Sequence, residues 1–237
     1  MQLQSGSLIS TQALLFDMDG TLVDSTAVVE RTWGRFAERH GLDLGQVLHA
    51  AHGRRTAETV AMFAPSGTDI EAETARIVAE EIADTDGIVE VPGARRFLQR
   101  LPLSRWAVVT SASRELAIRR MQAAGVPIPP ILITAEDVTT GKPAPEGYLA
   151  AAQALGVEPA HCLSFEDARA GLQSAHAAGT RVIALATTLG AEDLIGEEWI
   201  VDFRALEMLG PAGEAQGATL HFSVRTSVAE TALPTPA

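Results

Sequence analysis

Two aspartates near the start of the chain have a type and spacing that could do chemistry. Asp17 and Asp19 follow the apolar run at 13–16, and Gly20 and Thr21 come directly after them. One carboxylate at the end of a strand is common, but two so close together indicate a site that needs negative charge. One could attack an electrophilic centre, and the other could protonate the leaving oxygen and later activate water.

Polar side chains also follow three later apolar runs. They are Thr110 and Ser111 after 105–109, Lys142 after 131–134, and Glu166 and Asp167 after 161–165. In an open α/β sheet, ligands bind in the crevice at the carboxyl ends of the strands. We therefore expect these groups to converge on one point, although more than a hundred residues separate some of them.

The expected cluster combines carboxylates, a lysine and a hydroxyl. Clustered carboxylates repel one another, so they predict a hard divalent cation, and Mg²⁺ prefers such oxygen ligands. A lysine and a serine at the start of a helix suit a phosphate. Together these groups favour phosphoryl transfer, with one aspartate as nucleophile and the other as proton shuttle.

The elements that must position these residues alternate along the chain. Apolar runs predict five strands and amphipathic segments predict three helices, which favours an α/β fold with a doubly wound parallel sheet, a Rossmann-like core. The expected strands lie at 13–16, 105–109, 131–134, 161–165 and 181–186, and the helices at 114–125, 145–156 and 168–179.

One region breaks this alternation. Residues 26–91 have helical periodicity and no convincing strand, which predicts an inserted helical cap. The core is then expected at 12–25 and 92–226, with a further edge strand at 218–226. We expect residues 1–11 and 227–237 to be flexible tails.

Composition narrows the class of protein. The 237 residues are 46% hydrophobic, enough for a sizeable core, and the net charge of −12 disfavours nucleic acid as a partner. Cys162 is the single cysteine, and no apolar run reaches the length of a transmembrane helix. We therefore expect a cytoplasmic monomer that meets no membrane and acts on a small phosphorylated metabolite.

The motifs "DMDGT", "TSAS", "GKPAPE" and "FEDARAG", in this order, resemble the haloacid dehalogenase superfamily, specifically its phosphatases with a helical cap. The resemblance implies that Asp17 is the nucleophile and Asp19 the general acid/base. It implies Mg²⁺ ligands from Asp17, the backbone carbonyl of Asp19 and Asp167, with Glu166 as an additional partner. It also implies phosphoryl binding by Ser111, the N–H of Ala112 and Lys142. Either Thr110 or Ser111 supplies the hydroxyl, and Ser111 is favoured.

Longer stretches, among them "HGRRTAETVAMFAP" and "TAEDVTTGKPAPEGYL", are similar to the sugar and polyol phosphatases of that superfamily. Those enzymes act on hexose, hexitol, 2-deoxyglucose or glycerol phosphates. Because cap residues meet the substrate's far end in them, the resemblance makes His52, Arg54 and Arg55 candidates for substrate binding, and Arg55 the favoured one.

Three alternatives remain. A sugar phosphomutase of the same superfamily would carry a histidine where this chain has Val29 and an arginine where it has Thr56. A haloacid dehalogenase would lack Asp19. A non-catalytic binding protein on a phosphatase scaffold would have lost a carboxylate or the lysine, and none is missing here.

Overall fold

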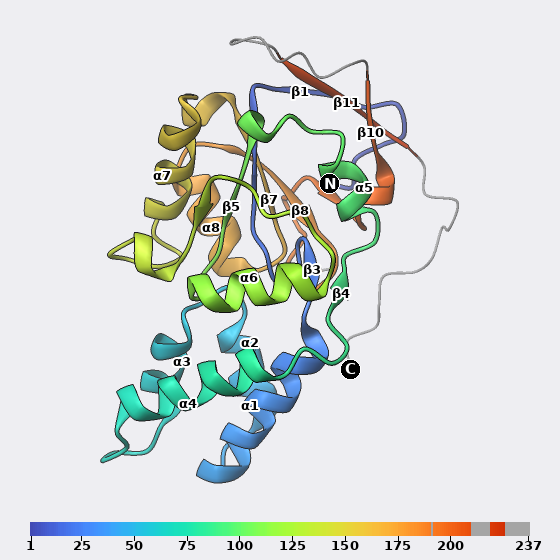
Figure 1. The fold of residues 1–237 in the computed structure, drawn as a ribbon. Helices are drawn as coiled ribbons and strands as arrows, with labels where there is room; N and C mark the ends of the chain where they lie inside the picture. Colours follow the sequence, from blue (N-terminus) through green and yellow to red (C-terminus); the bar gives the residue numbers. More distant parts are fainter. Residues whose placement is uncertain (191, 210–218, 226–237) are drawn as a thin grey trace.

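The computed structural model describes residues 1–190, 192–209 and 219–225. A six-stranded sheet forms its centre, and every neighbouring pair of strands runs parallel (Figure 1). Strand order grows outward from β2 in both directions, which confirms the predicted doubly wound α/β fold. In sheet order, the strands are β6 (Leu132–Ile133), β5 (Trp106–Val109), β2 (Ala13–Phe16), β7 (Cys162–Glu166), β8 (Arg181–Leu185) and β9 (Trp199–Ile200).

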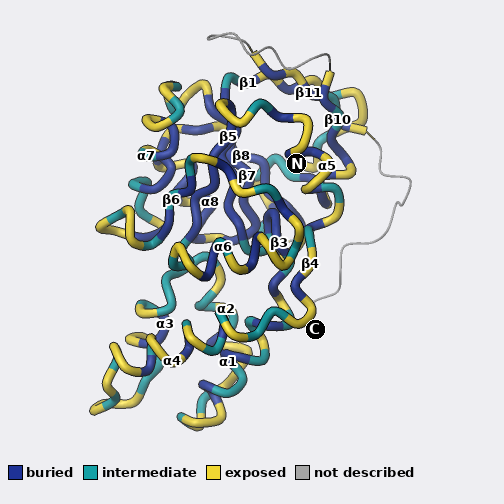
Figure 2. Tube along the Cα trace, viewed as in Figure 1, coloured by how far each residue is buried: buried dark blue, intermediate teal, exposed yellow. Residues whose placement is uncertain are grey.

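Burial on both faces explains why these strands are apolar throughout. Every residue of β2, β5 and β7 is buried, and Figure 2 shows the central strands as the darkest part of the trace. Side chains alternate between the faces of a strand. In β2, Leu14 and Phe16 pack on one face, and Ala13 and Leu15 on the other.

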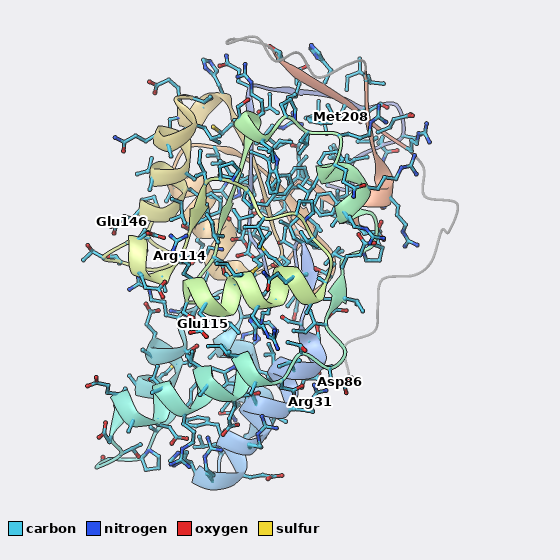
Figure 3. All side chains as sticks on the ribbon, in the orientation of Figure 1. Arg31, Asp86, Arg114, Glu115, Glu146 and Met208 are labelled. Carbon is cyan, nitrogen blue, oxygen red and sulfur yellow. The ribbon has the colours of Figure 1, made fainter. Side chains whose placement is uncertain are left out.

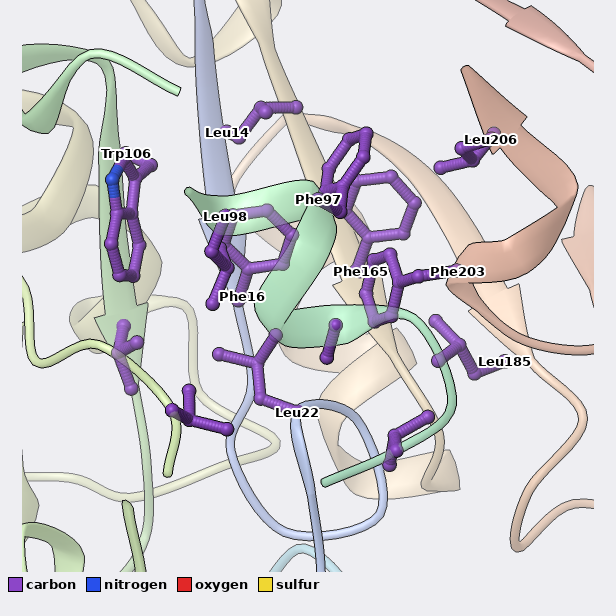
Figure 4. Packing of buried hydrophobic residues seen from close by; sticks show 14 of the residues in the cluster. Leu14, Phe16, Leu22, Phe97, Leu98, Trp106, Phe165, Leu185, Phe203 and Leu206 are labelled. Atoms are coloured by element: carbon purple, nitrogen blue, oxygen red, sulfur yellow. The ribbon is translucent and has the colours of Figure 1, made fainter. Parts of the chain in front are cut away.

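Helices cover both faces. Buried residues of α7 and α8 pack on one face, and those of α5 and α6 on the other. Aromatic rings fill the second face, where Phe16 stacks on Phe165 at 5.2 Å between centroids and Phe97 of α5 packs against both rings (Figure 4). The bounds are α5 (Ala94–Leu98), α6 (Arg114–Ala123), α7 (Glu146–Leu155) and α8 (Arg169–Ala177).

A second, antiparallel sheet packs beside the core in the order β1-β11-β10. Its strands are β1 (Leu8–Thr11), β11 (Leu220–Val224) and β10 (Leu206–Met208). The expectation that residues 1–11 form a flexible tail is therefore wrong: β1 alternates exposed and buried residues, and Ile9 enters the core. The strand expected at 218–226 exists as β11, but it is central in this small sheet. The predicted tail at 227–237 lies outside the described residues.

Four helices form a separate lobe at the end of the sheet where the strands terminate (Figure 1). We call α1–α4, residues 26–83, the helical lobe; its own small core contains Trp33, Phe36, Val47, Val60 and Ile77. Two short strands that pair antiparallel join it to the sheet, so the expectation of no strand in 26–91 is wrong at its end. The bounds are α1 (Thr26–His40), α2 (Leu44–Ala51), α3 (Thr56–Phe63), α4 (Ile70–Ala83), β3 (Val23–Asp24) and β4 (Val89–Glu90).

Ion pairs tie α1 to α4 and to the turn after it. They are Arg31–Asp84, Arg35–Glu80 and Arg39–Glu73. Arg31 also donates to the carbonyl of Asp86 at 2.7 Å, near the base of the lobe (Figure 3). Within the described ranges, no helix is both long and apolar enough to cross a bilayer.

Candidate active site

The ends of three neighbouring strands bring the first site residues together. Phe16 of β2 lies in register with Val108 of β5 on one side and Phe165 of β7 on the other. The next residue, Asp17, stays anchored because its N–H donates to the carbonyl of Phe165 at 3.0 Å. The residues that follow the three strands therefore share one edge of the sheet, as their positions after apolar runs predict.

Three carboxylates gather at this edge. Oxygens of Asp17, Glu166 and Asp167 all lie within 4.8 Å of one another, and all three residues are buried. Burial raises the pKa of Asp17 well above its ordinary range, and burial together with the charge of Glu166 raises that of Asp167 to about 7. A purely oxygen donor set with this much negative charge fits a hard divalent cation such as Mg²⁺.

Lys142 is a cation that contacts two of these carboxylates. Its Nζ donates to Oδ1 of Asp17 and, at 2.6 Å, to Oε1 of Glu166. Burial alone would lower the pKa of Lys142, but the two carboxylates outweigh it and the net shift is upward. Tyr148 donates its hydroxyl to the same Glu166 oxygen at 2.7 Å. Glu166 therefore fixes the lysine that contacts Asp17.

The Gly-Thr pair after the aspartates has a structural reason. Gly20 has φ +78°, and a Cβ there would lie 1.9 Å from Oδ2 of Asp167, so a larger residue could not fit. Thr21 donates its hydroxyl to Oδ1 of Asp167 at 3.1 Å. Sequence reasoning missed this role of Thr21, although its place in the first motif was a signal.

Asp19 lies in a different environment from Asp17. Its Oδ1 accepts from the Ser25 hydroxyl at 2.7 Å, and its Oδ2 accepts from Nη1 of Arg120 at 2.9 Å. Nη2 of the same arginine donates to Glu81 at 2.8 Å. Sequence reasoning identified neither Arg120 nor Glu81, and both line the same cavity as Asp19.

The end of β5 supplies two hydroxyls. The hydroxyl oxygen of Thr110 accepts a hydrogen bond from the N–H of Ala112 at 3.1 Å, which stabilises the turn after β5. Ser111 donates to the carbonyl of Gly53, in the helical lobe, at 2.8 Å. Thr110, Ser111 and Ala112, which follow β5, all line the cavity, and the Ser111 hydroxyl contacts the lobe directly.

A cavity lies between the sheet edge and the helical lobe. Its core side includes Asp17, Asp19 and Asp167, and the lobe side closes over them. The lobe contributes both apolar and polar residues: Val29, Trp33, His52, Arg54, Thr56 and Glu81.

The two favoured lobe residues have different positions. His52 lines the cavity, and although its side chain keeps contact with solvent, desolvation lowers the pKa of its imidazole. Arg55 does not line this cavity. Its guanidinium donates to the backbone carbonyls of Ala135, Val138 and Thr139 at 2.7 to 3.1 Å. Arg55 therefore joins the lobe to the core, and a contact between Arg55 and the substrate stays a prediction.

Comparisons with known proteins agree with this geometry. Residues 11–179 match the model of haloacid dehalogenase-like hydrolases. The chain is 44% identical over 178 residues to hexitol phosphatase A of Escherichia coli, covering 73% of this chain and 82% of the relative. It is 35% identical over 199 residues to glycerol-1-phosphate phosphohydrolase 1 of Saccharomyces cerevisiae, covering 78% and 79%.

A solved structure shares the fold. The CbbY protein of Rhodobacter sphaeroides, crystallised with phosphate, superimposes with a TM-score of 0.71 at 23% identity, over 81% of this chain and 95% of that one. The matched region of the family model contains every carboxylate of the acidic cluster and Lys142. This chain belongs to the haloacid dehalogenase-like hydrolases.

Proposed function

We propose that the protein is a magnesium-dependent phosphatase that hydrolyses a small sugar or polyol phosphate through an aspartyl-phosphate on Asp17. The observation that carries the proposal is the pairing of two aspartates with different surroundings. Asp17 is buried against Lys142 at the acidic cluster, while Asp19, two residues on, faces the same cavity from its wall.

The acidic cluster is the proposed metal site. Asp17, Asp167 and the backbone carbonyl of Asp19 would hold Mg²⁺, with Glu166 as an additional partner. When bound, the ion would neutralise the charge that develops on the phosphoryl oxygens. Glu166 already accepts from both Lys142 and Tyr148, so its main proposed task is to hold the lysine.

The first chemical step is attack by a carboxylate oxygen of Asp17 on phosphorus. The new Asp17–phosphorus bond forms as the ester P–O bond breaks, and a protonated Asp19 gives its proton to the leaving alcohol oxygen. The Ser111 hydroxyl, the Ala112 N–H and Lys142 would bind the other phosphoryl oxygens. Ser111 would then exchange its Gly53 partner for the substrate.

The second step regenerates the enzyme. Asp19, now ionised, takes a proton from water as the water oxygen attacks phosphorus, and the Asp17–phosphorus bond breaks to release inorganic phosphate. Both Asp19 oxygens accept hydrogen bonds in the structure, an arrangement that suits the ionised form. To carry a proton to the leaving group, the carboxyl must give up one of these partners.

The lobe side of the cavity supports the proposed substrate class. His52, Arg54 and Thr56 offer donors there, and Trp33 adds an apolar wall. A site built to bond hydroxyls rejects analogues that lack them, because its own polar groups are then left unpaired. Two relatives are named for hexitol phosphate and glycerol-1-phosphate, which are polyol esters of this kind.

Hydrolysis is proposed over phosphoryl transfer within one sugar. Val29 and Thr56, which stand where the resembling mutases carry a histidine and an arginine, both line the cavity. Neither side chain can act as that histidine or arginine would.

We also propose that residues 26–91 act as a cap that closes over the substrate. Ser111 and Gly53, and Arg55 with the carbonyls at 135–139, join this segment to the core. The proposed working form is a cytoplasmic monomer that binds neither nucleic acid nor membrane, in keeping with the net charge of −12 and the single cysteine.

The experiment is phosphate release from a panel of esters, with magnesium and with a chelator. The panel contains a hexitol phosphate, a hexose phosphate, glycerol phosphate, a nucleoside monophosphate and 4-nitrophenyl phosphate. We expect release with magnesium only, with the highest kcat/KM among the sugar and polyol esters. Equal activity in the chelator would contradict the metal assignment, and preference for the nucleotide would contradict the substrate class.

A further inference from the structure

A second buried cation lies at the cavity, on the helix α6 that separates the sheet from the helical lobe (Figure 1). Arg120 donates with Nη1 to Asp19 of the core and with Nη2 to Glu81 of α4, at 2.9 and 2.8 Å. Its two partners lie 101 and 39 residues away in the sequence. One guanidinium therefore connects the carboxylate assigned to proton transfer with the lobe above it.

Burial makes this connection strong. The side chains of Arg120 and Glu81 are each 5% exposed, against 28% for Asp19. Burial raises the pKa of Glu81, and Arg120 opposes that shift by favouring the charged form. Removing one member of such a group leaves a buried charge without compensation, which is strongly unfavourable. The lobe is therefore held against the core by the same group that contacts Asp19.

Other ion pairs of the lobe are more exposed and do not connect the lobe to the core. Those of Arg31, Arg35 and Arg39 join α1 to α4 or to the turn after α4, so they stay within the lobe, and their arginines are 27 to 42% exposed. They contact no residue of the acidic cluster. Arg120, in contrast, contacts Asp19 of the core and Glu81 of the lobe at the wall of the cavity. An ion pair that only stabilised the lobe would not need to contact Asp19.

We propose that Arg120 is a positioning residue that orients Asp19 for proton transfer only while Glu81 is docked against it. Docking of the lobe against the core then also orients Asp19, the general acid/base. This inference rests on the proposed function, because it needs Asp19 to act on the leaving oxygen and on water.

The leaving group separates this role from a purely structural one. A sugar alcohol is a poor leaving group and needs the Asp19 proton to depart, whereas 4-nitrophenolate leaves without one. A misoriented Asp19 should therefore slow formation of the phospho-enzyme from the sugar ester only. Hydrolysis of the phospho-enzyme needs Asp19 as base whatever the substrate, so with the aryl ester it becomes the slow step.

The test compares Arg120→Met, Arg120→Lys and Glu81→Ala with neighbours that carry the same side chains. Arg119→Met on α6 and Glu80→Ala on α4 are matched controls, because Arg119 is exposed and Glu80 pairs with Arg35 within the lobe. Measurements are steady-state kcat on a hexitol phosphate, pre-steady-state release of 4-nitrophenolate, and the thermal midpoint of each variant.

We expect Arg120→Met and Glu81→Ala to lower kcat on the hexitol phosphate by about 10- to 100-fold, a part of the loss typical of general acid–base catalysis. With 4-nitrophenyl phosphate, the same variants should show a burst of one nitrophenolate per enzyme followed by slow turnover. Arg120→Lys should recover part of kcat, because an ammonium can contact either carboxylate but lacks the fork that spans both. The two controls should match wild type.

Two results would overturn the inference. If wild type is active but the variants lose kcat equally on both esters with no burst, or lose only thermal stability, Arg120 is structural and the proposed function still stands. If wild type releases phosphate from neither ester, the proposed function fails, and the role of Asp19 on which the inference depends fails with it.

Discussion

Asp17 and Asp19, the two aspartates that follow β2, are each held by a buried cation shared with a glutamate. Lys142 lies between Asp17 and Glu166, and Arg120 lies between Asp19 and Glu81. The first group is built entirely from residues at strand ends of the core and the loop before α7. The second takes its glutamate from the helical lobe.

This difference assigns different behaviour to the two carboxylates. Asp17 has its cation whether or not the lobe is docked, so the proposed nucleophile is oriented in advance. Asp19 keeps Ser25 and Arg120 as core partners, but Arg120 has both of its own carboxylate partners only with the lobe docked. Preorganisation of a group that must attack is favourable, since no rearrangement then accompanies the reaction. A group that must first give and then take a proton gains from partners it can exchange.

The largest expected effect is that of Asp17→Asn. An amide cannot form the acyl phosphate, so kcat should fall by more than about 10⁴-fold, as when a nucleophile is removed from other enzymes. Lys142 keeps its contact with Glu166, so the fold should survive, as circular dichroism would check. If kcat of Asp17→Asn lay within tenfold of kcat of Asp19→Asn, the two aspartates would not have the distinct roles proposed for them.

Asp19→Asn should be the next most severe. The substitution keeps the shape but removes the proton shuttle, which typically contributes about 10²–10⁴-fold to the rate. Steady-state kinetics on a hexitol phosphate measures the loss. Near-normal kcat would assign the proton transfer to another group. The proposed role of Arg120 in orienting Asp19 would then be wrong as well.

Metal binding should change the dependence of stability on pH. Without metal, burial raises the pKa of Asp167 to about 7. Between about pH 4, the ordinary pKa of an aspartate, and about pH 7, the folded protein holds a proton on Asp167 that the unfolded chain lacks. The contribution of Asp167 to the free energy of unfolding is therefore present at low pH and is lost as the pH rises.

Magnesium should replace the proton. At a concentration of about 100 times its dissociation constant, magnesium should add about 2.7 kcal/mol to the free energy of unfolding. At a fixed magnesium concentration, this gain should be larger at about pH 8 than at about pH 5, because fewer protons then compete for the site. Thermal unfolding with and without the metal measures both. Asp167→Asn is the control; a wild-type gain that the variant reproduces in full would place the metal elsewhere.

The smallest expected effect is that of Arg55→Ala. Because Arg55 fastens the lobe to backbone carbonyls, its loss should lower kcat/KM by less than about tenfold, or 1.4 kcal/mol, and equally on a hexitol phosphate and 4-nitrophenyl phosphate. Arg54→Ala is the matched neighbour, and since Arg54 lines the cavity it should affect the hexitol phosphate more. A selective loss in Arg55→Ala would restore the substrate contact that its position argues against.

The core part of the site could be predicted because its signals are local. Asp17, Lys142 and Asp167 each follow an apolar run, and parallel strands bring their ends together whatever lies between them in sequence. The five predicted strands of the main sheet lie where the apolar runs are. In contrast, half of the residues of β1 are polar, and β9 lies in an apolar run of only three residues, 199–201.

The lobe part could not be predicted in the same way. Arg119 and Arg120 are adjacent on one helix, and Glu80 and Glu81 on another, and only packing decides which of each pair is buried. A buried charge in a helix has the same sequence signature as a solvated one until its partner is known. Arg55 shows the same limit, because its carbonyl partners lie about 80 residues away.

The proposed mechanism depends on phosphorylation of Asp17, which trapping of the phospho-enzyme would test. Asp19→Asn protein with magnesium and 4-nitrophenyl phosphate would be quenched in acid and digested, and the peptides that contain Asp17 and Ser111 would be analysed by mass spectrometry. We expect one phosphoryl group on Asp17 that hydroxylamine removes, as it removes an acyl phosphate. A chain that never gains the phosphoryl group, or gains a hydroxylamine-resistant one on Ser111, would contradict the proposed mechanism.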